Sequence, residues 1–245
     1  MELILSLFPG IGLLDKGFEA AGFCVVRGPD LIYGGDIRNF TAPPDMFTGI
    51  IGGSPCQDFS KARRCPPTGD GLEMIKEFKR VIMAARPEWY ISENVPGVPD
   101  IKITGYNWQR LDLRASYFGL KQRRLRHIQF GSTVGHNLCI ERPDNETGTL
   151  PTATANDDRT IQELAELQGL PPNFDIPAFT RGALTKAIGN GVPYPMALAI
   201  AQAVINRGHH KNLCGCGCGR KITGKSKTAS GACRKRLHDR KLLAA

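Results

Sequence analysis

Short apolar runs, separated by segments of helical pattern, constrain the fold of this chain more than any other feature of its sequence. Four such runs lie at residues 3–8, 23–26, 47–51 and 89–91. Their β-branched and aromatic content is typical of strands, and residues 72–85 between the last two runs have helical spacing. Strands that alternate with helices favour an α/β fold, a doubly wound and mostly parallel sheet with helices on both faces. We therefore expect ligands to bind where the strands end.

Length and composition are those of a folded protein with one principal domain. The chain has 245 residues, of which 41% are hydrophobic and 22% are charged. Its longest apolar stretches, residues 81–85 and 197–205, are shorter than the roughly 20 apolar residues of a membrane span. The amino terminus lacks a basic lead-in and reaches Pro9 too early for a secretory signal. We expect a cytoplasmic protein that is not inserted in a membrane.

The excess of positive charge lies at one end of the chain. The formal net charge is +9, and residues 209–245 contain 10 Lys or Arg against one acidic residue, Asp239. Residues 1–208 are balanced, with 22 basic and 22 acidic side chains. A basic tail is often only a solvated surface, but it also suits a polyanionic partner because it neutralises phosphates. The change in composition predicts a domain boundary near residue 208.

The first apolar run ends in a glycine-rich turn, SLFPGIG, at residues 6–12. Such a turn between a strand and a helix is either a tight connection or a place where a small ligand approaches the backbone. The ring of Phe8 can pack on a flat heterocycle, and Asp36 follows the second run. Together they suggest a cofactor that contains adenine, either S-adenosylmethionine or a dinucleotide.

Cys56 follows the third run in the sequence IGGSPCQDFS, so a strand end would present its thiol on a loop bounded by glycine and proline. A lone cysteine is more often a buried structural residue. Here Glu93 ends the next run and would lie beside Cys56 in a parallel sheet. A thiolate nucleophile next to a carboxylic acid is a pair suited to covalent catalysis.

Gln122, Arg124 and Arg126 alternate in the sequence KQRRLRHIQF, so on a strand their side chains would project from one face. An exposed basic edge strand is the simpler interpretation of this triplet. The more specific one is that the triplet brings fixed positive charge to the sheet edge that carries Cys56 and Glu93.

Seven short motifs follow one another in the order found in cytosine C5 DNA methyltransferases, and the chain resembles that family over nearly all of residues 1–206. The motifs are FPGIG at 8–12, GGDI at 34–37, GGSPCQDFS at 52–60, ENV at 93–95, QRRLR at 122–126, ELQGLP at 166–171 and GNGVPYP at 189–195. One such motif can arise by chance, but seven in order are specific. The resemblance implies the Rossmann-like fold of S-adenosylmethionine-dependent methyltransferases and methyl transfer to C5 of cytosine in duplex DNA.

The resemblance also implies roles for individual residues. Cys56 would add to C6 of the cytosine, Glu93 would protonate N3 and Arg126 would hold O2. Arg124 would complete the catalytic group by supporting the loop or a phosphate. Substrate contacts would come from Gln57, Ser60, Asn94 and Gln122. The S-adenosylmethionine pocket would be formed by Phe8, Pro9, Gly10, Gly12, Asp36, Ile37, Pro55, Asn190 and Val192, with Asp30 as the candidate for the ribose hydroxyls.

Three features depart from the family pattern. Ser6 and Leu13 stand where the family has an acidic residue and a glycine in the first motif, and Ser54 replaces a proline before the nucleophile. A large target recognition domain is missing, because only residues 127–165 separate QRRLR from ELQGLP. We expect a reduced recognition region in that interval, within a methyltransferase domain of residues 1–208.

The tail, residues 209–245, is expected to replace part of the missing domain. It contains four of the eight cysteines, Cys214, Cys216, Cys218 and Cys233, and His238 is an alternate metal ligand. Four sulfur ligands in so short a segment suit one structural zinc, which would display basic side chains to DNA. The spacing of the first three cysteines departs from the usual CxxC pair, so free thiols are the competing interpretation.

Duplex DNA is the expected partner of a monomeric enzyme. A tRNA cytosine methyltransferase is the first alternative, because related enzymes share the Cys and ENV motifs and lack a large recognition domain. A DNA-binding protein without catalytic activity is the second alternative, although Cys56, Glu93 and Arg126 are all present. The sequence leaves open whether a restriction-modification system, a phage or a host regulator provides the context.

Overall fold

The computed structural model describes residues 1–60, 63, 65–140, 148–216, 219–231, 233–235 and 237–238. The strands are β1 (Leu3–Leu7), β2 (Cys24–Arg27), β3 (Gly49–Gly52), β4 (Trp89–Asn94), β5 (Asn107–Arg114) and β6 (Leu125–Ser132). The α-helices are α1 (Leu13–Ala20), α2 (Asp70–Ala85), α3 (Ile161–Leu167), α4 (Arg181–Asn190) and α5 (Tyr194–Ile205). Short 3-10 helices complete the elements: η1 (Leu31–Tyr33), η2 (Ile37–Asn39), η3 (Gln57–Phe59) and η4 (Ala115–Phe118).

The six strands of the described residues form one sheet in the order β2-β1-β3-β4-β6-β5. β1 pairs in parallel with β2 and β3, and β3 pairs in parallel with β4. β6 is antiparallel to β4 and to β5, so among the described strands it alone opposes the others. This arrangement confirms the expected α/β fold with a mostly parallel sheet. The chain passes from β1 out to β2 and returns to β3, so the carboxyl ends of β1 and β3 flank the switch point where such sheets bind ligands.

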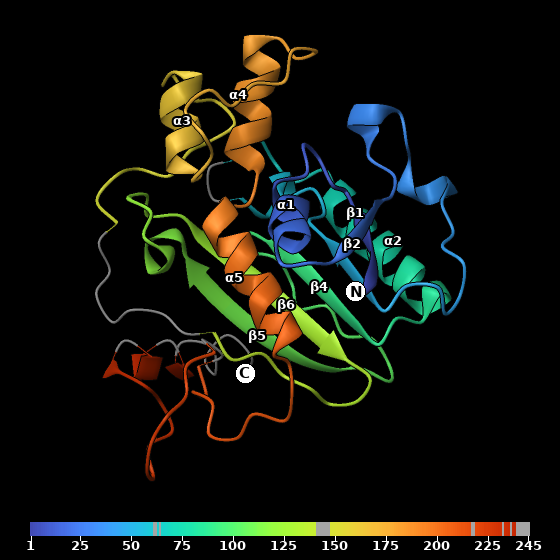
Figure 1. Ribbon diagram of the computed structural model, residues 1–245, viewed down its shortest axis with the longest axis vertical. Helices are drawn as coiled ribbons and strands as arrows, with labels where there is room; N and C mark the ends of the chain where they lie inside the picture. The colour runs from blue at the N-terminus through green and yellow to red at the C-terminus, as the bar shows by residue number, and fades with distance from the viewer. Residues whose placement is uncertain are drawn as a thin grey trace.

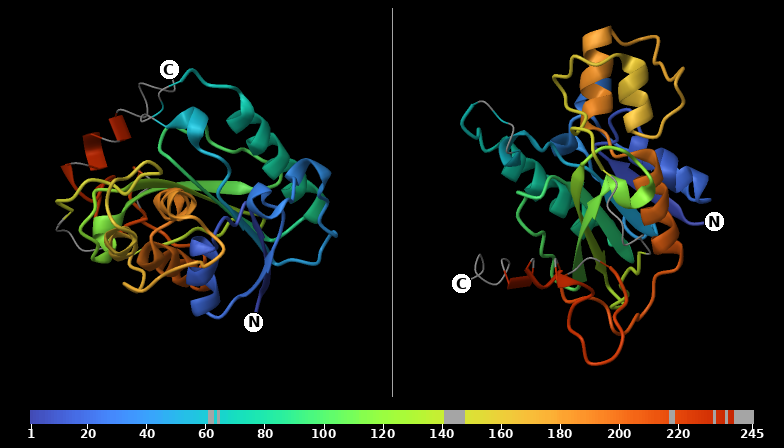
Figure 2. Two further views of the ribbon diagram at one scale, coloured as in Figure 1. Left: turned by 90° about the horizontal axis from the view of Figure 1, so that it is seen from above. Right: turned by 90° about the vertical axis from the view of Figure 1, so that its left-hand side faces the viewer.

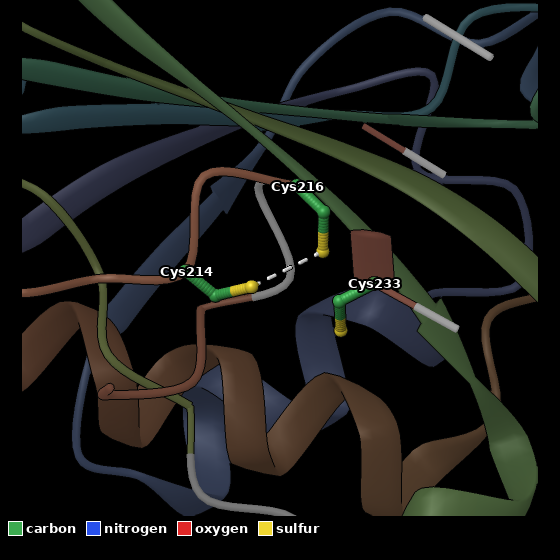
Figure 3. Close-up of side chains that lie close together, drawn as sticks. All are labelled: Cys214, Cys216 and Cys233. Carbon is green, nitrogen blue, oxygen red and sulfur yellow. Dashed lines mark hydrogen bonds between the residues drawn. The ribbon is translucent and has the colours of Figure 1, made fainter. Parts of the chain in front are cut away.

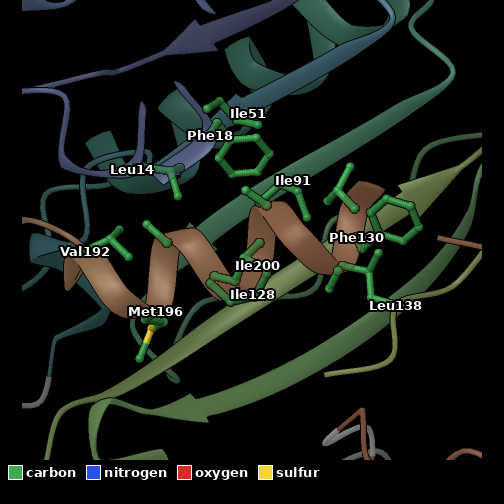
Figure 4. Close-up of a cluster of buried hydrophobic side chains, with 14 of the residues drawn as sticks. Leu14, Phe18, Ile51, Ile91, Ile128, Phe130, Leu138, Val192, Met196 and Ile200 are labelled. Carbon is green, nitrogen blue, oxygen red and sulfur yellow. The ribbon is translucent and has the colours of Figure 1, made fainter. Parts of the chain in front are cut away.

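Helices cover both faces of the sheet, with α1 and α5 on one face and α2 on the other (Figures 1 and 2). Neighbouring strand residues point to opposite faces, so Ile51 packs toward α5 whereas Ile50 packs toward α2. Figure 4 shows the apolar cluster on the α5 face of the sheet, in which Phe130 and other strand side chains pack against α5. α1 and α5 approach closely at Gly17, where a Cβ would lie 2.5 Å from the backbone of Ala197. A larger residue at position 17 would force the two helices apart.

α3 and α4 form a small lobe beyond the strand ends (Figure 1). α3 begins at Thr160, whose hydroxyl oxygen accepts from the N–H of Glu163 while the Glu163 carboxylate accepts from the N–H of Thr160. The lobe packs on the turn after β1 through Leu164, Ile188 and Ile11. The interval 127–165, predicted to hold a reduced recognition region, begins inside β6 and ends inside α3. Only residues 133–160 are therefore left between these two elements.

One described segment, Arg181–Ile205, is long and apolar enough to cross a membrane by length and composition alone. It consists of two separate helices, because α4 ends at the extended Gly191 and Pro193 cannot continue its hydrogen bonding. α5 buries Met196 and Ile200 completely against the sheet. The apolar composition of this segment is therefore explained by its place in the core.

Side chains of β5 contact the segment after β6 and the tail. The side-chain amide of Gln109 donates to the carbonyl of Leu138 at 3.0 Å and accepts from the N–H of Leu138 at 2.7 Å. The N–H of Ile140 donates to the carbonyl of Gly219 at 3.3 Å, and Gly219 lies against Leu111 of β5. The tail therefore packs against the sheet at this point.

Candidate active site

The glycine turn after β1 has an unusual backbone. Phe8 has a φ of 55° and Gly10 a φ of 54°, in the left-handed region that a phenylalanine rarely adopts. The N–H of Gly10 donates to Oδ2 of Asp30 at 2.8 Å, and Oδ1 of Asp30 accepts from the N–H of Ile32 at 2.9 Å. Asp30 thus ties the turn to the chain that follows β2. Backbone strain fixed in this way is typical of ligand-binding turns.

A cavity of about 560 Å³ lies at the carboxyl ends of β1 and β3, within the size range of small-molecule sites. Nine of the ten residues predicted to contact S-adenosylmethionine line it: Phe8, Pro9, Gly10, Asp30, Asp36, Ile37, Pro55, Asn190 and Val192. Among the described residues, Gly12 is the exception. It precedes α1 with a φ of 75°, and a Cβ there would meet the guanidinium of Arg27 at 2.7 Å. Gly12 therefore shapes the turn behind the cavity wall.

Cys56, Glu93 and Arg126 come together at one edge of the sheet. Gly52 of β3 pairs with Ser92 of β4, so the loop that carries Cys56 leaves the sheet beside Glu93. Nε of Arg126 and Oε1 of Glu93 form an ion pair at 2.9 Å, and the two side chains are only 11% and 9% exposed. Cys56 and Glu93 line the cavity together. The Cys56 thiol and the Glu93 carboxyl are thus available to one bound molecule, and Arg126, which is paired with Glu93, is not among the residues that line the cavity.

Burial governs the protonation of these groups. It raises the pKa of the Glu93 carboxyl, although the charges of Arg126 and Arg124 oppose the shift. Burial also raises the pKa of the Cys56 thiol, the charge of Glu93 raises it further, and the same two arginines lower it. The carboxyl is therefore held toward its acid form, in which it can donate a proton. Ionisation of the thiol depends on the balance of charges around it.

The loop that carries Cys56 is fixed from β4. Nδ2 of Asn94 donates to the carbonyl oxygen of Ser54 at 3.0 Å and lies 3.1 Å from its hydroxyl oxygen. Asn94 is 2% exposed and positions the loop, and the substrate contact expected of it stays a prediction. Gln57 lines the cavity, as a substrate contact requires. Ser60 ends η3 on the same loop.

Arg124 lies behind the site. β6 begins at Leu125, so Arg124 precedes the strand, but the expected alternation holds: Gln122, Arg124 and Arg126 are buried whereas Lys121 and Arg123 are exposed. The Arg124 guanidinium is 1% exposed and donates to the carbonyls of Ala153, Gly189 and Gly191 at 2.8, 2.9 and 2.7 Å. These contacts agree with loop support, one of the two roles expected for Arg124, and its place in the catalytic group stays a prediction.

Gln122 is fully buried as well, and the substrate contact expected of it stays a prediction. Its Nε2 donates to the carbonyl of Leu167 and, at 3.0 Å, to Oε1 of Gln168, while its Oε1 accepts from the N–H of Ala153. Gln168 donates in turn to the carbonyl of Ile188 at 2.6 Å. The sequence pattern did not single out Gln168, although its place in ELQGLP was a signal. Together with Arg124, these amides hold the end of α4 that forms one wall of the cavity.

Asp15 lines the cavity and was not predicted either. Its side chain is fully buried, the hydroxyl of Ser6 donates to its Oδ1 at 2.6 Å, and Nε of Arg27 donates to its Oδ2 at 3.0 Å. Burial raises the pKa of the Asp15 carboxyl in spite of these partners. Asp15 thus brings a carboxyl group next to Ser6, where the family has an acidic residue. An acid between Leu14 and Phe18 on the apolar face of a helix was the available signal.

Two exposed apolar side chains complete the described cavity wall. Leu31 is 71% exposed and Ile32 is 51% exposed, and both lie in η1 directly after Asp30. Phe179 lines the cavity from the loop before α4. Large apolar side chains left open beside a cavity indicate a ligand with an apolar face.

The tail brings three of the predicted metal ligands together. The sulfur atoms of Cys214, Cys216 and Cys233 lie within 4.8 Å of one another, and all three residues are buried. Cys218, the fourth predicted ligand, lies outside the described residues. His238 is exposed, on the same helical segment as Cys233.

Comparisons with known proteins agree with this geometry. Residues 32–157 and 141–206 match the family model of the C-5 cytosine-specific DNA methylases. The Type II methyltransferase M.NgoFVII of Neisseria gonorrhoeae is 32% identical over 181 residues, which are 59% of this chain and 48% of that protein. The Type II methyltransferase M.HindV of Haemophilus influenzae is 29% identical over 170 residues, which are 56% of this chain and 55% of that protein. The chain therefore spans about half the length of these two relatives.

A solved structure shares the fold. The methyltransferase EhMeth of Entamoeba histolytica superposes with a TM-score of 0.61 and 11% sequence identity. The match covers 84% of this chain and 98% of that chain. At this identity the likeness establishes the common fold alone.

Proposed function

The chain belongs to the family of C-5 cytosine-specific DNA methylases, and we propose that it transfers a methyl group from S-adenosylmethionine to C5 of cytosine in duplex DNA. The family resemblance inferred from the seven motifs is thereby confirmed. The observation that carries the proposed activity is the ion pair of Glu93 and Arg126 beside Cys56 at the cavity.

The three side chains suit the activation of an electron-poor pyrimidine. Addition of the Cys56 thiolate to C6 forms an S–C bond and makes C5 nucleophilic, because the electron pair of the C5–C6 double bond moves toward C5. Glu93 in its acid form donates a proton to N3, and Arg126 donates hydrogen bonds to O2. Once C5 carries the methyl group, a water molecule takes the C5 proton, and the electron pair of the C–H bond restores the C5–C6 double bond. Cys56 then leaves as thiolate, and N3 returns its proton.

The cavity fits S-adenosylmethionine, which supplies an electrophilic methyl group when bound. The side chains of Phe8, Leu31 and Ile37 offer apolar surface to the adenine ring. Each carboxylate oxygen of Asp30 accepts one backbone N–H and keeps further lone-pair capacity for ribose hydroxyls. Asn190 lines the cavity from the end of α4 that Arg124 holds. These residues would bind and orient the cofactor beside Cys56.

A cytosine reaches Cys56 only after it leaves the base stack, which costs a few kcal/mol. Phosphate contacts that hold the DNA would offset part of this cost. The exposed basic side chains of the tail support such contacts, and among the described residues they are Lys211, Lys221, Lys225, Lys227, Arg234 and Lys235. The duplex is therefore proposed to contact both the cavity edge and the tail.

Transfer of a tritium-labelled methyl group tests the activity directly. The full chain is incubated with labelled S-adenosylmethionine and either duplex DNA or tRNA. We expect label in DNA, loss of turnover in Cys56→Ser, and normal turnover in Cys65→Ser, which changes an exposed cysteine on the same segment. Labelled tRNA with unlabelled DNA would overturn the proposed substrate.

The covalent step has its own test. Duplex oligonucleotides that contain 5-fluorocytosine should form a stable adduct with the chain in the presence of S-adenosylmethionine, because fluorine at C5 cannot leave as a proton does. Mass spectrometry should place the adduct on Cys56. Bisulfite sequencing of DNA from expressing cells identifies the target sequence for the oligonucleotide, and the absence of an adduct on that sequence would refute the mechanism.

A further inference from the structure

Three sulfur atoms converge inside the tail, far from the catalytic cysteine in sequence. Cys214 and Cys216 lie on the segment before residue 217, and Cys233 lies on the helical segment that follows, as Figure 3 shows. Their relative exposures are 3%, 0% and 1%. The sulfurs of Cys214 and Cys216 are 3.5 Å apart, and the largest separation within the group is below 4.8 Å. Two parts of the tail therefore meet at a buried group of thiols.

Two of these sulfurs accept hydrogen bonds from neighbouring groups. The N–H of Ala229 donates to Sγ of Cys214 at 3.1 Å. Nη2 of Arg220 donates to Sγ of Cys233 at 2.9 Å and also to Oγ of Ser230 at 3.1 Å. Hydrogen bonds from a cation and from backbone N–H groups stabilise an ionised sulfur more than a neutral one. Such donors around metal-bound thiolates are the usual supporting contacts of a metal site.

The spacing of the sulfurs agrees with a tetrahedral metal ion. Zinc binds thiolates at about 2.3 Å, so two sulfurs on one tetrahedral ion lie about 3.8 Å apart. The Cys214–Cys216 separation of 3.5 Å is close to that value, and the 4.8 Å limit on the other two separations is compatible with it. Thiolate ligands select zinc over magnesium, calcium and manganese, which prefer oxygen.

The apolar core of the tail is small among its described residues. The partly buried apolar side chains packed on the three cysteines are few: Ile222, Ala229 and Leu237. A segment of this size seldom folds on so small an apolar cluster without a metal or disulfides. A hydrophobic cluster of neutral thiols would leave the donors of Arg220 and Ala229 poorly used.

We propose that Cys214, Cys216 and Cys233 bind one structural zinc ion that joins the two parts of the tail. The metal is the core of the tail and takes no part in methyl transfer. A tetrahedral zinc has one more position, and Cys218 and His238 are the candidates for its ligand that the sequence analysis named. The proposal stands whether or not the methyl-transfer assay succeeds, because its readouts are metal content and spectra.

Metal analysis of the purified full chain tests the proposal. We expect about one zinc per chain after dialysis, and less than a tenth of that in Cys233→Ser and in Cys216→Ser. Cys65→Ser, which changes a cysteine outside the cluster, should retain the full amount. Variants Cys218→Ser and His238→Ala identify the fourth ligand by the loss of zinc in one of them.

Cobalt substitution covers the case in which a cysteine variant fails to fold. Wild-type chain exchanged into Co²⁺ should show sulfur-to-cobalt charge-transfer bands and the visible spectrum of a tetrahedral thiolate site, and added Zn²⁺ should abolish both. A wild-type chain that binds neither ion, and whose tail thiols react with a thiol reagent equally fast with and without zinc, would overturn the proposal. So would a disulfide between Cys214 and Cys216 that forms when the reductant is removed in the presence of zinc.

Discussion

Arg124 offers the sharpest test of how the cavity wall is held, through the substitution Arg124→Met. The change keeps much of the buried volume and removes three hydrogen bonds to carbonyl oxygens, of 2.8, 2.9 and 2.7 Å. Gly191 keeps a bond from Gln168, but Ala153 and Gly189 lose the donor of Arg124. The ordinary helical donor for the Gly189 carbonyl would be residue 193, which is a proline without an N–H.

The size of the effect follows from these two carbonyls. A buried polar group left without a partner costs about 1–3 kcal/mol, so two of them predict a decrease of roughly 2–6 kcal/mol in the free energy of unfolding. That is a large part of the roughly 5–15 kcal/mol typical of a domain. The free energy of unfolding of Arg124→Lys should lie between those of wild type and Arg124→Met, since a lysine can reach some of the same oxygens with a single ammonium group.

Urea unfolding followed by the fluorescence of the buried Trp89 measures this decrease, and calorimetry measures the affinity for S-adenosylmethionine. The matched control is Arg123→Met, which removes the same charge from the neighbouring, exposed position and should change stability by less than about 0.5 kcal/mol. We expect Arg124→Met also to weaken cofactor binding, because Asn190 lies between two of the affected carbonyls. Equal unfolding free energies for the two methionine variants would refute the reasoning.

Three further predictions concern charge. Glu93→Gln should lower the pKa of the Cys56 thiol, because the charge of Glu93 raises that pKa. The pH profile of iodoacetamide alkylation at Cys56 measures the thiol pKa, and an unchanged midpoint would contradict the prediction. The pKa of Asp15 is raised in the folded chain, so the unfolded chain ionises first as pH rises above about 4. The free energy of unfolding therefore falls as pH rises toward the folded-state pKa and stays at the lower value above it. The stability of Asp15→Asn relative to wild type should therefore increase with pH over that range in urea titrations. Changing Arg234 and Lys235 to alanine should reduce the salt dependence of DNA binding by about 0.9 in log–log slope for each phosphate that is no longer neutralised, and an identical slope would exclude a role for these two side chains in DNA binding.

The catalytic edge was predictable because it depends on local order and one topological rule. Cys56 and Glu93 each follow or end a short apolar run, and parallel strands bring such positions to one edge of the sheet. Neither inference needed a long-range contact. β5 was not predicted, since its edge position leaves the sequence NWQRLDLR with polar side chains at exposed and half-buried sites.

The sequence was least informative where long-range contacts determine the surroundings of a polar side chain. Arg124 and Gln122 resemble substrate-facing residues in the sequence, but their partners lie on segments 29 to 67 residues away that close over them. Asp15 looks like an ordinary acid in the first turn of a helix, and only its contacts with Ser6 and Arg27 explain its burial. No local pattern specifies such partners.

The contacts between β5 and its neighbouring segments affect more than the architecture of one molecule. An outermost strand with unpaired N–H and C=O groups is a template on which a second chain can add a strand. The bond between Gln109 and Leu138 and the bond between Ile140 and Gly219 hold the neighbouring segments against β5. A chain cut at residue 208 would lack Gly219 and uncover Leu111, so it should self-associate during expression. The tail would then reduce aggregation, in addition to its proposed contact with DNA.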